Sequence, residues 1–326
     1  MPGISTFSVK GLDFFFESAR AKVDGKPVFQ RVRFIQARQL VATLGLLFCA
    51  LPVRAQADRA HELASQASGQ VTSDCQNVTT LADCHPGKPT GCSNAASPRY
   101  DAYLNFLKNQ EPARDIAPSR VLGVNDLISL EDQIPAGIGR SNHAQFADQL
   151  ADRGNGVGEG NIYAVVGYLY FVENTAITSH HRGETCNCQL RGNSTFDYHL
   201  GIGFDATLAQ EIRTAPPVHD PRNPVLPEQS SVVAEMTPHT RAVKWTVARL
   251  NGQLGKQVKV IGQLTLDNVH VNSNDDCAFL DEPGGSCWRA SAWEIHPVTQ
   301  FFVCKAGKTC SATSPDSDWV RLEDLP

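Results

Sequence analysis

The sequence predicts a mainly β fold, an OB-type five-stranded barrel with one helix, preceded by a short helical region and a loop-rich extension. Three observations predict it. Apolar residues recur at helical spacing up to residue 153 and in an extended pattern after Gly160. Five extended runs follow, and one helical run separates the third from the fourth. Three strands, a helix and two strands is the order of an OB barrel, although an open α+β sandwich would give the same order.

The first segment, residues 1–57, is expected to contain a cleaved secretory signal peptide. A basic cluster at 31–38 precedes an apolar run at 40–51, and the small-x-small sequence of residues 55–57 follows. The apolar run of about 12 residues is too short to span a bilayer stably. The residues before the basic cluster fit no targeting segment, so we expect an extension from a misassigned translation start. The protein is therefore predicted to be secreted or periplasmic, with no transmembrane segment after cleavage.

Residues 58–99 and 100–157 precede the predicted barrel. The first range is rich in Ser, Thr, Gly, Ala and Asn, carries three cysteines, and is typical of a loop-rich extension. In the second range, apolar residues such as Tyr103, Phe106 and Leu107 recur at helical spacing. Three prolines interrupt this pattern, so short helices are expected.

The predicted barrel domain covers residues 158–312. Its first strand, 161–174, is aromatic and β-branched, with Gly167 in the middle where a strongly curved strand needs a glycine. The second strand, 195–204, alternates apolar and polar residues, and the third, 231–236, follows a proline-rich loop.

A helix is expected over residues 241–255, with Val243 on its apolar stripe and a glycine at its end. The fourth and fifth strands, 256–269 and 291–304, complete the barrel. Residues 313–326 are expected to form a C-terminal tail.

After residue 57 the chain carries 21 Lys and Arg against 31 Asp and Glu, a net charge of about −10. Such a surface repels phosphate backbones, so a nucleic-acid partner is disfavoured. We expect a small molecule or an envelope protein instead. The motifs of the commonest hydrolases and nucleotide-binding proteins, G-x-S-x-G, the Walker loop and H-E-x-x-H, do not occur.

Nine cysteines follow residue 57, and in an exported protein clustered cysteines are more often disulfides than metal ligands. Cys277 with Cys287, and Cys304 with Cys310, could each close a short loop. Cys186 and Cys188 are separated by a single residue and are too close to bridge each other. Each of them therefore needs a distant disulfide partner, unless the pair binds zinc. The odd count leaves one thiol free or in an intermolecular bond. The cysteines expected in disulfides, with the pairing open, are Cys186, Cys188, Cys277, Cys287, Cys304 and Cys310.

Polar residues occur within otherwise apolar contexts on four of the predicted strands. Strands distant in sequence can bring such residues together on one face of a barrel. Imidazole and carboxylate groups suit zinc, iron or manganese, and a divalent metal such as zinc is the expected cofactor if one binds. The candidate ligands are His199, Glu235, Asp267, His270, Glu294 and His296, with Asp197 on the same face of its strand as His199.

The same residues allow three other interpretations. They could act as a general acid and base, form a buried polar network that fixes strand register, or lie on an ordinary solvated face. Trp293 and Ile295 should face the core, with Glu294 and His296 on the opposite side.

The strings FDYHLGIG, SVVAEMTPH, GQLTLDNVH and SAWEIHPVTQFFV resemble a group of exported bacterial proteins with no assigned activity. The recurring strings of that group are a D-x-H strand, a G-x-L-x-x-D-x-x-H strand and a W-E-I-H-P strand, and the last is the most specific. The resemblance covers about residues 160–304. The resemblance implies an exported bacterial OB-like module, and it does not indicate any reaction.

Three functions follow from these observations. An exported binding module of unknown ligand leads, because OB barrels bind ligands on an open strand face. A metal-dependent hydrolase that uses the six candidate residues is the first alternative, so whether the protein is an enzyme stays open. An envelope-associated interaction domain, linked to a partner by the free cysteine, is the second.

Overall fold

The computed structural model describes residues 7–9, 12–14, 22–23, 26–27, 80–84, 101–151, 156–174, 184–192, 194–217, 224–279 and 286–326. The chain divides into two compact units, Met1–Gly45 and Leu46–Pro326. In the first unit, short strands pair as β1 (Phe7–Val9) with β2 (Leu12–Phe14), and β3 (Lys22–Val23) with β4 (Lys26–Pro27). The predicted signal cleavage site and most of the predicted extension lie outside the described residues.

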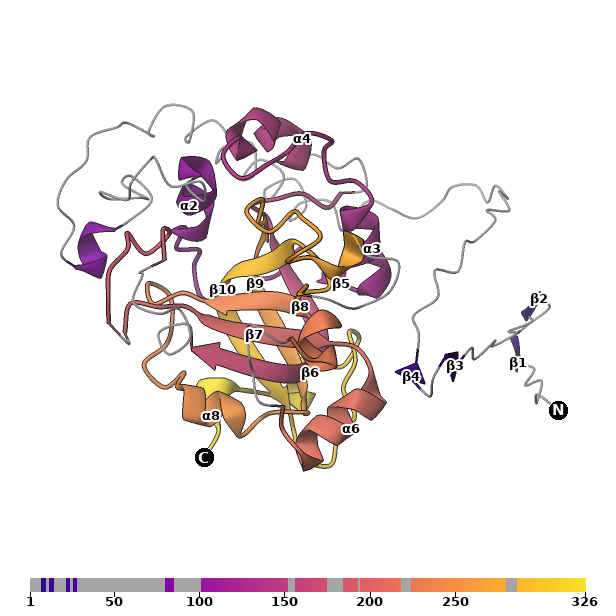
Figure 1. The fold of residues 1–326 in the computed structure, drawn as a ribbon. Helices are drawn as coiled ribbons and strands as arrows, with labels where there is room; N and C mark the ends of the chain where they lie inside the picture. Colours follow the sequence, from indigo (N-terminus) through magenta and orange to yellow (C-terminus); the bar gives the residue numbers. More distant parts are fainter. Residues whose placement is uncertain are drawn as a thin grey trace, which may run out of the picture. The chain divides into compact units, whose positions relative to one another are not determined.

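Five strands of the second unit close into a barrel. They are β6 (Ile162–Asn174), β7 (Tyr198–Gly203), β8 (Val232–Met236), β9 (Gln257–Leu266) and β10 (Trp293–Cys304). The order around the barrel is β6, β7, β8, β10, β9 and back to β6; β8 and β10 are parallel, and the other pairs are antiparallel. This confirms the predicted mainly β, five-stranded barrel (Figure 1).

Two further short strands extend the sheet. β5 (Val121–Leu122) adds to β6, and β11 (Trp319–Arg321) adds to β10. The residues expected to form a C-terminal tail thus belong to the sheet, and Trp319 and Leu322 are buried. Burial of these two apolar side chains stabilises the packing of the end of the chain against the barrel.

The alternation of β10 separates an apolar side from a polar side. Trp293 and Ile295 belong to the main hydrophobic core, which confirms their predicted direction. Glu294 and His296 therefore point to the other side of the strand. They are only 1% and 0% exposed there, so another part of the chain covers the outer side of the barrel.

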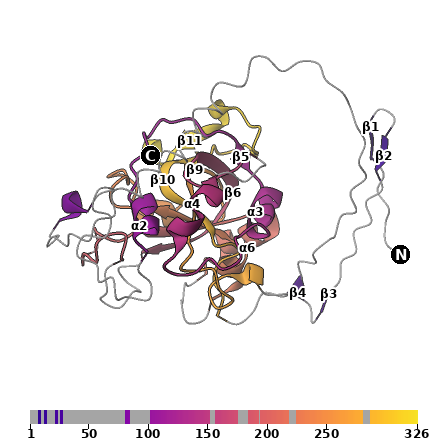
Figure 2. The same ribbon diagram turned by 90° about the horizontal axis from the view of Figure 1, so that it is seen from above.

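Helices lie toward both ends of the barrel (Figures 1 and 2). Leu127, Leu130 and Leu150 from two of them join the main core. The helices are α2 (Ala102–Lys108), α3 (Val124–Glu131), α4 (Ala147–Ala151), α6 (Ala206–Thr214), α7 (Leu226–Gln229) and α8 (Val247–Asn251). The 3₁₀ turns are η1 (Leu81–Asp83), η2 (His143–Phe146), η3 (Cys277–Phe279), η4 (Asp316–Asp318) and η5 (Leu322–Asp324). Within the described part of the chain, no helix is long and apolar enough to cross a membrane.

The helix predicted over residues 241–255 is much shorter than expected. Only α8 is an α-helix there, because Thr246 adopts an extended conformation and caps it by accepting from the Arg249 amide. Val243, expected on the apolar stripe, is 98% exposed. In its place Trp245 packs into the core and donates from Nε1 to Glu323. Tertiary contacts with the end of the chain thus override the helical pattern.

Helix α6 was not predicted. Asp205 caps it by accepting from two backbone amides, and Ala209 and Ile212 face a small apolar cluster with Tyr170 and Phe171. In the sequence, Asp205 precedes the apolar residues Ala209 and Ile212, which are three positions apart. An aspartate before such a pattern is a signal for the N-terminus of a helix.

Three disulfides cross-link the described residues. Cys277–Cys287 and Cys304–Cys310 close the two short loops, as expected, and Cys188 pairs with Cys84 across 104 positions. The expectation that Cys186 also has a distant disulfide partner is wrong. Its thiol is free and buried.

Candidate functional site

The polar side chains of neighbouring strands form a row on the outer side of the barrel. His199 on β7 lies directly opposite Glu235 on β8, and Glu173 on β6 is the other neighbour of His199. The parallel pairing of Ile295 with Ala234 brings the next residues of β10 beside Glu235. Strand register therefore explains why residues far apart in sequence meet.

His296 lies among three carboxylates at the centre of this row. Its Nδ1 is 2.7 Å from Glu235 Oε2 and 3.3 Å from Glu294 Oε1, while its Nε2 is 3.7 Å from Asp197 Oδ2. Neither ring nitrogen meets hydrogen-bond geometry with any described residue. A buried imidazole placed this way is not an ordinary surface residue, which excludes the solvated-face interpretation for His296.

Two buried cations fill one end of the cluster. Lys108 Nζ lies 2.8 Å from Asp267 Oδ2, 2.9 Å from Glu294 Oε1 and 3.8 Å from Glu235 Oε2. Arg289 donates from Nη2 to Glu294 Oε2 at 2.6 Å. The carboxylates of this end are thus neutralised by the chain itself.

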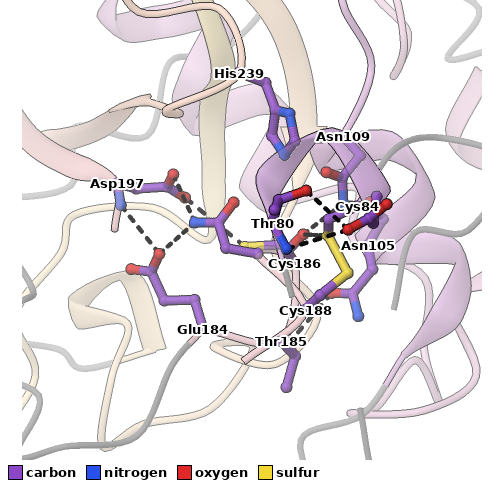
Figure 3. The surroundings of a disulfide bond; sticks show 12 residues. Thr80, Cys84, Asn105, Asn109, Glu184, Thr185, Cys186, Cys188, Asp197 and His239 are labelled. Atoms are coloured by element: carbon purple, nitrogen blue, oxygen red, sulfur yellow. Dashed lines mark hydrogen bonds between the residues drawn. A yellow bond between two sulfur atoms is a disulfide. The ribbon is translucent and has the colours of Figure 1, made fainter. Parts of the chain in front are cut away.

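The cover over the cluster comes from α2 and the segment before β7. Lys108 ends α2, and Asn109 donates to the Cys186 carbonyl at 2.6 Å. Figure 3 shows Cys186, Glu184 and Asp197 beside the Cys84–Cys188 disulfide, and the Asp197 amide donates to Glu184. The disulfide ties this cover to the η1 turn.

At the edge of the cluster three rings are only partly buried. The rings of His199 and Trp288 stack with centroids 6.3 Å apart, and His270 meets Trp288 edge-on at 5.2 Å. Asp275 lies 3.3 Å from His270 Nδ1 and accepts from Trp288 Nε1. We call His199, Trp288, His270 and Asp275 the ring edge; these residues connect the buried charges to solvent.

The electrostatic environment shifts the pKa of most groups in the cluster. Burial lowers the pKa of His199, but the carboxylates of Glu235 and Glu173 outweigh burial and hold it well above its ordinary value. Burial likewise opposes protonation of His296, yet Glu235 raises its pKa to about 9. Burial raises the pKa of Glu235, but His199, then Lys108 and His296, hold it well below its usual range. Perturbed groups gathered in one place are typical of functional sites.

Every candidate ligand predicted from the sequence contacts this cluster. Glu235, Glu294 and His296 form its buried centre, and His199 lies at the ring edge. Asp267 and His270 lie after the end of β9, and His270 Nε2 is 3.8 Å from Asp267 Oδ2. The sequence did not reveal Lys108, Arg289 or Trp288. Lys108 is 159 residues from Asp267 along the chain, and a lysine at the end of a helix is ordinarily solvated.

Among the residues that the structure describes, three overlapping groups of side chains have ligand atoms close enough for one metal ion, each with its atoms within 4.8 Å of one another. One of them, which contains Asp267 and Glu294, already surrounds Lys108. The groups are Glu184, Cys186 and Asp197; Asp197, Glu235 and His296; and Glu235, Asp267 and Glu294.

The chain was compared with known protein families, curated proteins and solved structures. No protein-family model, curated protein or solved structure matches the chain.

Proposed function

We propose that the protein is an exported binding module of OB type whose ligand docks at the ring edge. The barrel order supports the OB assignment, because β6 to β10 follow the closed order 1-2-3-5-4 with the third and fifth strands parallel. OB barrels bind ligands on the face of their second and third strands. Here these strands are β7 and β8, which carry His199 and Glu235.

The observation that carries the proposal is the ring edge itself. Trp288 lies between two imidazoles, partly open to solvent, with Asp275 beside it and the carboxylates of Glu173 and Glu184 near His199. The acidic groups beside the indole suit a planar or cationic ligand, which would share the ring with Arg289, whose Cζ lies 4.7 Å from the ring centroid. The disulfides fit export, because such bonds persist in oxidising compartments.

A panel of small quaternary ammonium, guanidinium and polyamine compounds tests this proposal. Binding is measured by calorimetry and by tryptophan fluorescence on the full chain. We expect Trp288→Ala to weaken the binding of any hit at least about tenfold, a typical cost for a central aromatic contact. Trp319→Phe, on the distant β11, is the matched control and should bind as the natural chain does. Equal binding by Trp288→Ala would place the ligand elsewhere.

A metal-dependent hydrolase is the second candidate, favoured by one specific observation. The six residues predicted as ligands do lie in one cluster, with Glu235, Asp267, Glu294 and His296 buried and His199 and His270 at its edge. Hydrolysis of ester, peptide and phosphodiester model substrates, with added zinc or with a chelator, tests it. Turnover that is lost in the chelator supports an enzyme.

The third interpretation, an envelope-associated domain linked to a partner by a free cysteine, finds less support. Among the described cysteines the free thiol is that of Cys186, which is buried and points at Asp197 Oδ2 at 3.8 Å. A thiol in this position does not present itself to a partner chain.

A further inference from the structure

We propose that Asp197, Glu235 and His296 bind a divalent first-row metal ion, with zinc as the best match. This inference deepens the second candidate function, the hydrolase, by naming the ion and its ligands. It does not depend on turnover, because ion binding is measured without substrate.

The three side chains converge from separate parts of the barrel. Asp197 directly precedes β7, Glu235 lies on β8 and His296 on β10, and one ligand atom from each lies within 4.8 Å of the others. They are 0%, 3% and 0% exposed. Three protein ligands are the number found in catalytic zinc sites, where a fourth position is left for water.

His296 supplies an independent sign of a missing partner. Its Nε2 forms no hydrogen bond with any described residue, and it points at Asp197 Oδ2 from 3.7 Å. That separation is too long for a hydrogen bond. It is close to the roughly 3.4 Å between two ligand atoms that each lie about 2.1 Å from one tetrahedral ion.

The surroundings of the ligands also fit. His296 Nδ1 lies 3.3 Å from Glu294 Oε1, a carboxylate outside the proposed ligand set, and metal-binding histidines commonly have a carboxylate beside their other ring nitrogen. Asp197 Oδ1 accepts from Asn187 Nδ2 at 3.1 Å, which fixes the orientation of the carboxylate and leaves Oδ2 toward His296.

Charge explains why the ion belongs at this end of the cluster. At the other end, Lys108 and Arg289 already lie among Asp267 and Glu294, and an ion there would have to displace an ammonium group. An imidazole together with carboxylates favours zinc, iron or manganese over magnesium and calcium, which prefer oxygen ligands alone.

The test is a metal titration of the full chain, prepared without a polyhistidine tag and stripped with a chelator. We expect one equivalent of Zn²⁺ by calorimetry and elemental analysis, and competition by Mn²⁺ but not by Ca²⁺ at the same concentration. Bound Co²⁺ should give the visible absorption of a four-coordinate site. His296→Gln and Asp197→Asn should each weaken binding by about 100-fold or more, at or beyond the loss caused by removing an outer-shell partner.

Two matched variants locate the ion. His270→Gln removes an imidazole outside the proposed ligand set and should bind zinc as the natural chain does. Cys186→Ser replaces the thiol of the neighbouring group, which lies 3.8 Å from Asp197 Oδ2, with a hydroxyl that can also donate to this oxygen, so zinc should still bind. Circular dichroism and thermal melting check folding, and Asp197→Asn keeps the side-chain shape if His296→Gln does not fold.

The proposal is overturned if the natural chain binds no stoichiometric ion, or if Asp197→Asn binds with unchanged affinity. A loss seen only in Cys186→Ser or His270→Gln would also overturn it, because the ion would then lie elsewhere. Stoichiometric zinc without any hydrolysis leaves the metal site standing and rejects the hydrolase alone.

Discussion

Glu131 and Asp276 share one backbone donor: the Ala292 amide lies 2.8 Å from Glu131 Oε1 and 3.1 Å from Asp276 Oδ2. Burial, and then the charge of Asp276, raise the pKa of Glu131 to about 8. Burial also raises the pKa of Asp276. The two carboxyl groups therefore hold a proton between them near neutral pH, just before β10 begins.

This pair predicts a pH dependence of stability. The folded-state pKa of Glu131 is raised above its ordinary value of 4.5, so its contribution is complete below about pH 4.5 and is lost as pH rises to about 8. In this window the folded chain holds a proton that the unfolded chain has released. The free energy of unfolding should fall by up to about 1.4 kcal/mol per pH unit from this one proton.

Glu131→Gln should flatten that slope, measured by urea unfolding at several pH values. The glutamine amide can donate to Asp276 in place of the shared proton, and its carbonyl can accept from Ser291 and Ala292. Glu111→Gln, at an exposed glutamate, is the control and should keep the natural slope. An unchanged slope in Glu131→Gln would show that this pair does not hold the proton.

Replacement of Trp293 tests the core direction of β10. Its side chain is fully buried and donates from Nε1 to the Leu130 carbonyl. Trp293→Ala should lower the free energy of unfolding by about 3 to 5 kcal/mol through the cavity it leaves. Trp293→Phe keeps most of the apolar volume, so it should lose less. Chemical denaturation compares the two, and equal losses would argue against a cavity as the cause.

The Cys277–Cys287 disulfide should contribute to stability by restricting the unfolded chain. The two residues are 10 positions apart, and closing a loop of this length is worth about 2 to 3 kcal/mol in the unfolded chain. The double variant Cys277→Ser with Cys287→Ser should lose about that amount in urea unfolding. Peptide mapping of the natural chain should recover the pair as one cross-linked fragment. Both cysteines recovered as free thiols would contradict the prediction.

Much of the barrel and of the site could be predicted from the sequence because strand patterns are local. Alternation in the segment around Trp293 and His296 placed the apolar and polar side chains on opposite sides, and the structure agrees. His199, Glu235, Glu294 and His296 lie together because the register of β7, β8 and β10 is itself set by that alternation.

The rest depends on contacts that no local pattern encodes. Lys108 reaches the cluster from a helix 159 positions before Asp267, and Cys84 reaches Cys188 across 104 positions. The helix predicted at 241–255 is short because Trp245 turns toward the end of the chain. Such long-range packing decides between structures that local propensity leaves nearly equal.

The last prediction concerns Lys108 as the cation that closes the cluster. Its side chain is 8% exposed, and its ammonium nitrogen lies within 3 Å of carboxylate oxygens of both Asp267 and Glu294. Burial works against its charge, yet the carboxylates of Asp267, Glu235 and Glu294 hold its pKa well above the ordinary value. Lys108→Met keeps the length of the side chain but leaves those carboxylates short of a partner. Removing one member of a buried ion pair costs about 3 to 5 kcal/mol, so urea unfolding should show a loss of that size.

Lys308→Met is the matched control, since Lys308 is 55% exposed and pairs with Asp318 at the surface, where such pairs contribute at most about 1 kcal/mol. Similar losses in the two variants would mean that water or protons, rather than Lys108, neutralise the acidic end of the cluster.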